Sequence, residues 1–248
     1  MIVTLVCLAT LGAAQPVDSQ AAGRAIIQAM HDRYAGHWYR TLTFVQQNTR
    51  YFYPGDSVQH SVWFERASIP GKLRIDFRDG PGFIPGDGIV FASDTLFRMQ
   101  SGAVKSATAF IHPLMVLGFD VYAQPVDQIL AKLTTLGFDL ATGHDDTWGG
   151  RAVYVVGAKA GDGRTRQFWV DKERLVFVRM LEPAQPDSTK ISETQFNAYQ
   201  KAGDGWVAAE VLFIADGKPV WKEQYSDIKT GVTVADAVFD PKQWNATK

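Results

Sequence analysis

The segment from Thr41 to Phe77 constrains the fold more than any other part of the chain. Residues 41–53 and 57–69 are rich in Val, Thr, Tyr, Phe and Trp, which are residue types that favour β-strands. The turn sequence Pro54-Gly55-Asp56 separates the two runs, and this arrangement is typical of a β-hairpin. The segment therefore predicts that the fold begins as an antiparallel sheet.

A third run, residues 72–77, alternates strictly between apolar and charged side chains. Its apolar members are Leu73, Ile75 and Phe77, and its charged members are Lys72, Arg74 and Asp76. Successive side chains of a strand point to opposite faces of a sheet. We therefore expect the apolar set to point inward and the charged set to lie on a wet face.

The remaining chain continues this pattern, with helices at its start and in its middle. Helical spacing of apolar residues, with suitable caps and stops, predicts helices over residues 17–36, 113–120 and 125–136. Further strands are predicted over residues 89–92, 95–100, 150–157, 165–171, 175–181, 190–200, 205–215 and 218–228. The total is about ten or eleven strands. Because no linker interrupts them, residues 15–248 are expected to form a single domain.

Composition and charge narrow the class of partner. The formal net charge is −1 and no block of Lys or Arg stands out, which argues against nucleic-acid binding. Aromatic residues make up 12% of the chain and need either a deep core or an apolar cavity. Several strands carry apolar residues on both faces, which a sheet requires only when both faces are covered or one face lines a cavity.

The first fourteen residues differ from the rest because they are uncharged and apolar. The run is too short to span a bilayer and ends in the small residues Gly12-Ala13-Ala14. Residues 1–14 are therefore expected to be a cleaved signal peptide, although they lack its charged start; the alternative is a buried N-terminal strand. Cys7 is the only cysteine, so the mature chain would have no disulfide and no thiol nucleophile.

Residues with the chemistry of an active site are sparse. The five histidines form no tight metal-binding motif, and the best local cluster, His144-Asp145-Asp146, lies in a stretch expected to be a polar turn. The chain also lacks the Gly-x-Ser-x-Gly motif that forms the nucleophile elbow of serine hydrolases. Glu65 is expected to pair with Lys or Arg on the wet face, or with His60 across the hairpin. We expect no cofactor, no metal and no catalytic residue.

The order of several short motifs resembles that of one protein superfamily. The motifs follow a leading helix and end with a Tyr-x-x-Ile strand and a Phe-x-Pro. They are Phe44-Val45-Gln46, Trp63-Phe64-Glu65-Arg66, Ser93-Asp94-Thr95-Leu96-Phe97, Pro113-Leu114-Met115-Val116-Leu117, Phe168-Trp169-Val170-Asp171, Tyr225-Ser226-Asp227-Ile228 and Phe239-Asp240-Pro241. In this order they resemble the periplasmic lipoprotein carriers, the LolA/LolB-like proteins. The sequence departs from that pattern at Asp94-Thr95, where the family has Asp-Gly, and residues 190–219 are longer than in compact carriers.

The resemblance implies a mainly β, α+β fold, in which a strongly curved antiparallel sheet or unclosed β-barrel is covered by helices. It also implies a non-enzymatic, monomeric periplasmic carrier that binds lipid or lipoprotein acyl chains in an apolar cavity. Such a carrier would transfer its ligand towards the outer membrane, between a membrane transporter and an outer-membrane acceptor. A helix-covered sheet with a solid core is the alternative fold. The alternative functions are an envelope sensor or regulatory binding module on this fold, and a hydrolase whose site is assembled from distant residues.

The candidate ligand-binding residues come from the hairpin strands and from the short apolar helix. The resemblance implies that Arg66 lies near the cavity and holds the helical lid closed, whereas the alternative is an exposed arginine at a strand end. Trp63 is either core or cavity wall. Leu114, Met115 and Leu117 would plug the empty cavity, because a short helix depends on what it covers. The full candidate set is Phe44, Trp63, Arg66, Phe77, Leu114, Met115 and Leu117.

Overall fold

The structure, a computed structural model, describes residues 22–247 and contains one antiparallel sheet of thirteen strands. The strands are β1 (Thr41–Tyr51), β2 (Val58–Ser68), β3 (Lys72–Asp79), β4 (Gly88–Ala92), β5 (Thr95–Gln100), β6 (Ala103–Ala109), β7 (Gly143–Trp148), β8 (Arg151–Val156), β9 (Gln167–Asp171), β10 (Phe177–Pro183), β11 (Ile191–Ala202), β12 (Gly205–Ala215) and β13 (Lys218–Thr230). The helices are α1 (Ala22–Tyr34), α2 (Pro113–Gly118) and α3 (Val126–Thr135), with short 3-10 turns η2 (Asp120–Tyr122), η3 (Asp236–Phe239) and η4 (Pro241–Gln243).

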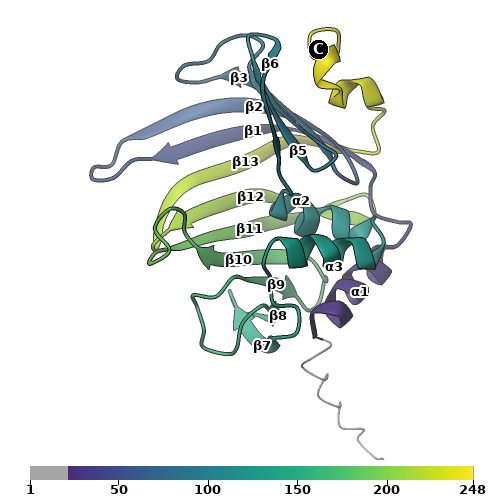
Figure 1. Cartoon of the computed structure of the whole chain (residues 1–248), viewed down its shortest axis with the longest axis vertical. Helices are drawn as coiled ribbons and strands as arrows, with labels where there is room; N and C mark the ends of the chain where they lie inside the picture. The colour runs from purple at the N-terminus through teal and green to yellow at the C-terminus, as the bar shows by residue number, and fades with distance from the viewer. Residues whose placement is uncertain (1–21, 248) are drawn as a thin grey trace, which may run out of the picture.

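Strands that are neighbours in the sheet are also neighbours in the sequence, except where β1 pairs with β13. This pairing joins the N-terminal meander β1–β6 to the C-terminal meander β7–β13 in the middle of the sheet. The edge strands are β6 and β7, which do not pair with each other, and Figure 1 shows the sheet curving around the helices. The predicted fold class, an unclosed β-barrel covered by helices, is confirmed.

The helices cover the concave face of the sheet (Figure 1), where they form the main core. The expected apolar stripes are buried: Ile27 and Met30 on α1 and Ile129 and Leu133 on α3 have no exposed surface. They pack with the inward side chains of β8 to β12 in one continuous cluster. Burial of these stripes holds short helices that would be marginal alone in water.

Two strands differ from the expectation, and both lie at the edges of the sheet. β6 was not predicted, and β7 occupies residues 143–148, where the sequence predicts a polar turn. β7 is mainly polar, β6 consists of small or polar residues apart from Val104, and no residue of either strand is buried. An edge strand pairs on one side only and commonly carries polar residues, so its sequence lacks the apolar alternation of a central strand.

The convex face of β3 is also covered, which corrects the expectation of a wet face for Arg74 and Asp76. Both side chains are buried beneath the C-terminal turns, and Arg74 has no exposed surface. Trp244 packs over the Arg74 guanidinium, with 3.8 Å between the guanidinium carbon and the ring centre. Gly88 permits this contact, because a Cβ atom there would lie 2.5 Å from the Trp244 ring.

The predicted signal peptide, residues 1–14, and Cys7 lie outside the described residues. Within residues 22–247, no helix has both the length and the apolar character needed to cross a membrane.

Candidate functional site

An apolar cavity of about 160 Å³ lies between the concave face of the sheet and the α2 segment. Its floor and walls come from β1, β2, β3, β11, β12 and β13, and its roof comes from residues 112–119. Most of the lining side chains are apolar or aromatic. They include Leu42, Phe44, Trp63, Ala67, Ile69, Leu73, Ile75, Leu114, Met115, Phe119, Phe196, Val211, Phe213 and Tyr225.

The sequence of the roof explains its shape. Pro113 occupies the first turn of α2, where its missing N–H costs no helical hydrogen bond. Gly118 is packed so closely that a Cβ atom would lie 2.9 Å from the Phe196 ring. Asp120 then accepts a hydrogen bond from the backbone N–H of Gly71, at 2.9 Å. This bond fixes the end of the roof against the turn between β2 and β3.

Four of the seven candidate ligand-binding residues line the cavity: Phe44, Trp63, Leu114 and Met115. The other three, Arg66, Phe77 and Leu117, do not. Leu117 points into the main core and has no exposed surface. Phe77 lies opposite Trp63 on the adjacent strand β3 and stacks on it, with 4.9 Å between the ring centres, so it flanks this wall residue.

Arg66 does not hold the roof, because its side chain leaves β2 on the convex face. Its guanidinium pairs with the Asp76 carboxylate and donates to the backbone oxygen of Thr247, at 3.1 Å. The expected lid clamp is therefore wrong, and so is the alternative of an exposed strand end, since the Arg66 side chain is only 12% exposed. Arg66 forms an ion cluster with Arg74 and Asp76. Residues 236–247, here called the C-terminal cap, cover this cluster.

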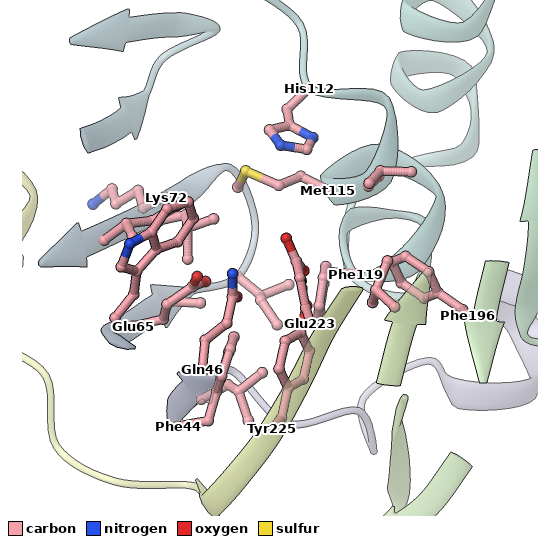
Figure 2. A pocket seen from close by; sticks show the side chains of 18 of the residues that line it. Phe44, Gln46, Glu65, Lys72, His112, Met115, Phe119, Phe196, Glu223 and Tyr225 are labelled. Atoms are coloured by element: carbon pink, nitrogen blue, oxygen red, sulfur yellow. The ribbon is translucent and has the colours of Figure 1, made fainter. Parts of the chain in front are cut away.

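The cavity floor also carries polar side chains. One of them is expected on a wet face from the sequence, and the other two are not among the predicted site residues. Glu65, Gln46 and Glu223 line the cavity, so the expectation that Glu65 pairs with a cation on a wet face is wrong. Figure 2 shows these three side chains rising from the sheet towards Met115 and His112. The strand register explains this placement: Gln46 lies opposite Trp63 on β2 and opposite Tyr225 on β13.

The two glutamates differ in their hydrogen bonds. Glu223 accepts a bond from the Tyr225 hydroxyl at 2.6 Å and one from the Trp221 indole N–H at 3.2 Å. Glu65 is only 4% exposed and makes no side-chain hydrogen bond within residues 22–247. Its carboxyl group therefore remains available to a molecule in the cavity.

Burial shifts the protonation of these groups. Desolvation raises the pKa of Glu223 from 4.5 to about 7. Desolvation, with a further contribution from the Glu223 charge, raises the pKa of Glu65 well above its ordinary value. Desolvation also lowers the pKa of His112 to about 4, so this imidazole is neutral at physiological pH.

We expect the stability of the protein to fall as pH rises from about 4.5 to about 8. The folded state keeps a proton on Glu223 that the unfolded chain has already lost, so deprotonation of Glu223 opposes folding. Glu223→Gln should remove about 2–3 kcal/mol of this pH dependence. Urea unfolding at both ends of the range measures it, with the exposed Glu173→Gln as the matched control. Parallel pH profiles for wild type and Glu223→Gln would contradict the assignment.

The histidine-acid cluster on β7 does not assemble into a metal site. His144 Nδ1 lies 3.0 Å from the backbone oxygen of Ala158, and its Nε2 lies 3.8 Å from an Asp146 oxygen. Across residues 22–247, no group of three or more His, Cys, Asp or Glu side chains is positioned to hold a metal ion.

No protein-family model matches the chain, and no curated protein matches its sequence. Solved structures match its fold. A DUF1329 family protein from Desulfovibrio piger superposes with a TM-score of 0.60 at 13% identity, covering 94% of this chain and 100% of that chain. A putative outer membrane lipoprotein-sorting protein domain from Vibrio parahaemolyticus gives a TM-score of 0.56 at 14% identity, covering 90% and 97% of the two chains.

A LolA superfamily protein from Nitrosomonas europaea gives a TM-score of 0.53 at 10% identity, over 88% of this chain and 97% of that chain. These three likenesses each extend over 88–94% of the chain. At 10–14% identity, these likenesses establish the fold but not the ligand. The predicted resemblance is therefore confirmed at the level of architecture: the chain has a LolA-like fold.

Proposed function

We propose that this protein is a non-enzymatic carrier that binds lipid or lipoprotein acyl chains in the cavity beneath α2. The observation that carries the proposal is the cavity itself, which is walled by apolar side chains and roofed by a six-residue helix. Each methylene group moved from water into such a site contributes about 0.8 kcal/mol. The LolA-like fold and the lipoprotein-sorting likeness support this function.

The size of the cavity implies that the roof moves on binding. A volume of about 160 Å³ corresponds to about five water molecules, which is less than a long acyl chain occupies. The α2 helix is too short to be stable by itself, and it is held by the surfaces it covers. Met115 in this roof has a flexible thioether that repacks around different shapes. Displacement of the roof would let the cavity extend along the concave face.

The same proposal places the protein in the periplasm, where it would receive its ligand from a membrane transporter and deliver it to an outer-membrane acceptor. The apolar N-terminal run motivates the export step. A carrier differs from a sensor module on the same fold because it releases its ligand to a membrane. It differs from a hydrolase because the ligand is recovered intact.

A transfer assay tests the proposal directly. Donor vesicles that contain a fluorescent acyl lipid are mixed with acceptor vesicles, and the protein should accelerate movement of the lipid between them. Mass spectrometry of the acceptor fraction should recover unmodified lipid. Binding without transfer would favour the sensor module, a cleaved lipid would favour the hydrolase, and no binding would overturn the cavity assignment.

We expect Ala67→Leu to weaken acyl-probe binding strongly by filling the cavity. Ala67 is buried on β2 and its side chain lines the cavity floor, so added methyl groups occupy the ligand volume. The affinity should fall about tenfold or more, since the added side-chain volume excludes several methylene groups of the ligand from the cavity. Ala152→Leu, at an exposed position of β8, is the matched control. A thermal-denaturation curve checks that both variants fold, and wild-type affinity in folded Ala67→Leu would contradict the prediction.

A further inference from the structure

The walls of the cavity are apolar, but its floor carries the carboxyl groups of Glu65 and Glu223, which attract only positive charge when they are ionised. Glu65 and Glu223 stand on β2 and β13, the two strands that flank β1, and Gln46 of β1 lies between them in the register. A cavity built for hydrocarbon alone would have no reason to bury two carboxyl groups, because each loses its hydration. Within residues 22–247, the buried carboxyl of Glu65 has no hydrogen-bond partner, whereas Glu223 accepts two hydrogen bonds that compensate its burial.

We propose that the carboxyl groups of Glu65 and Glu223 form a subsite for the ammonium head of an amphiphile whose alkyl chain lies in the cavity. This inference rests on the proposed function, because it assigns the head group of the molecule that the cavity binds. Two carboxylates can accept hydrogen bonds from one primary ammonium group, and the Gln46 side chain lies between them. Such charge-assisted bonds are about twice as strong as neutral ones.

Among the charged and titratable side chains of residues 22–247 that line the cavity, only these two acids can place a charge inside it. Lys72, from β3, directs its ammonium outward to Asp236, at 3.0 Å. His112, in the roof, is neutral because burial lowers its pKa to about 4. Tyr225, from β13, stays protonated because burial raises the pKa of its hydroxyl, which donates a hydrogen bond to Glu223. No other ionisable side chain among residues 22–247 lines the cavity.

The raised pKa values of the two acids couple binding to pH. The ligand-free pair retains protons near neutral pH, because burial disfavours the charged forms. An ammonium ion beside the carboxyls favours their ionised forms, so binding should release a proton. The affinity for an alkylamine should therefore rise about tenfold between about pH 6 and about pH 8.

A head-group series separates this inference from the proposed function. Dodecylamine, dodecanol and dodecanoic acid share one alkyl chain, and each is titrated into the whole folded protein below its solubility limit and, where it forms micelles, below its micelle concentration. We expect dodecylamine to bind about tenfold more tightly than dodecanol. Calorimetry in two buffers of different ionisation enthalpy should show release of a proton with the amine only. Glu65→Gln and Glu223→Gln should each remove most of the preference, and Glu173→Gln, an exposed control, should keep it.

The outcomes separate the two ideas. If dodecanol and dodecanoic acid bind as tightly as the amine, the cavity binds alkyl chains and the ammonium subsite is wrong. If none of the three amphiphiles binds, the proposed function itself fails. If a glutamine variant does not fold, proton release by the wild-type protein still decides, and amine binding without it would overturn the subsite.

Discussion

Asp76→Asn should destabilise the protein by about 3–5 kcal/mol, because it leaves buried guanidinium groups without their counter-ion. The Asp76 carboxylate accepts hydrogen bonds from Arg74 Nη2 at 2.8 Å and Arg74 Nε at 3.1 Å, and it also pairs with Arg66. The Arg74 side chain has no exposed surface, so water cannot replace the lost bonds. Urea unfolding followed by tryptophan fluorescence measures the change.

The matched control is Asp56→Asn, at an exposed position in the turn between β1 and β2. Its effect should stay within about 0.5 kcal/mol, as is usual for surface substitutions. High salt should not rescue Asp76→Asn, because buried pairs are screened little by mobile ions. An Asp76→Asn protein as stable as the control would mean that the C-terminal cap does not seal this cluster.

The C-terminal segment explains how three ionic side chains, one on β2 and two on β3, can be buried together. The Arg74 guanidinium also donates to the backbone oxygens of Trp244, at 3.1 Å, and Val238, at 3.3 Å, and to the Thr247 hydroxyl, at 2.8 Å. These partners come from the last residues of the described chain. The C-terminal segment is thus tied to β3 by hydrogen bonds that no apolar side chain could make, and it covers the convex face of the N-terminal meander.

The strand pattern predicts an antiparallel, mainly β chain, and the resemblance adds the unclosed barrel covered by helices. The hairpin around Pro54-Gly55-Asp56 and the turn at Asp216-Gly217 both form, the latter with positive φ at both residues. Alternation in these runs reflects pairing with immediate neighbours in the chain, which local sequence specifies well. The two strands that escaped prediction, β6 and β7, lie at the edges, where pairing from one side leaves no apolar signature.

The site could be predicted only in part, for a related reason. Glu65 lies two residues from Trp63 and two from Ala67, so strict alternation along β2 places all three on one face. That signal is present, but a charged residue in a strand usually faces water, and this preference favours the opposite face. Glu223 carries the same signal, since it lies two residues from Trp221 and two from Tyr225. Its proximity to Glu65, however, depends on the pairing of β1 with β13, which is distant in sequence.

Arg74 and Asp76 show the converse limit. Their alternation correctly places them on the face opposite the cavity, but it cannot reveal that residues more than 160 positions later fold over that face. Burial of a charge depends on a tertiary contact and on a counter-ion, and neither is written in the strand itself. Local sequence thus determined the face of each side chain and left its environment undetermined.

Leu117→Ala should cost about 2–5 kcal/mol of stability, whereas Leu114→Ala, in the same helix, should cost about 1 kcal/mol or less. Leu117 is fully buried in the main core, so its truncation leaves an empty space among packed side chains. Leu114 is half-buried and faces the existing cavity, so its truncation only enlarges a space that is already there. Urea unfolding of both variants measures the difference.

The same pair of variants separates the core from the ligand site. Leu114→Ala makes room beneath the roof, so it should raise the affinity for a fluorescent fatty-acid probe severalfold. Leu117→Ala should leave the affinity of the folded fraction unchanged, because its side chain does not touch the cavity. Equal stability losses, with no change in probe affinity for either variant, would show that α2 is ordinary core. The α2 helix would then have no moving part, and a carrier mechanism that depends on its displacement would fail.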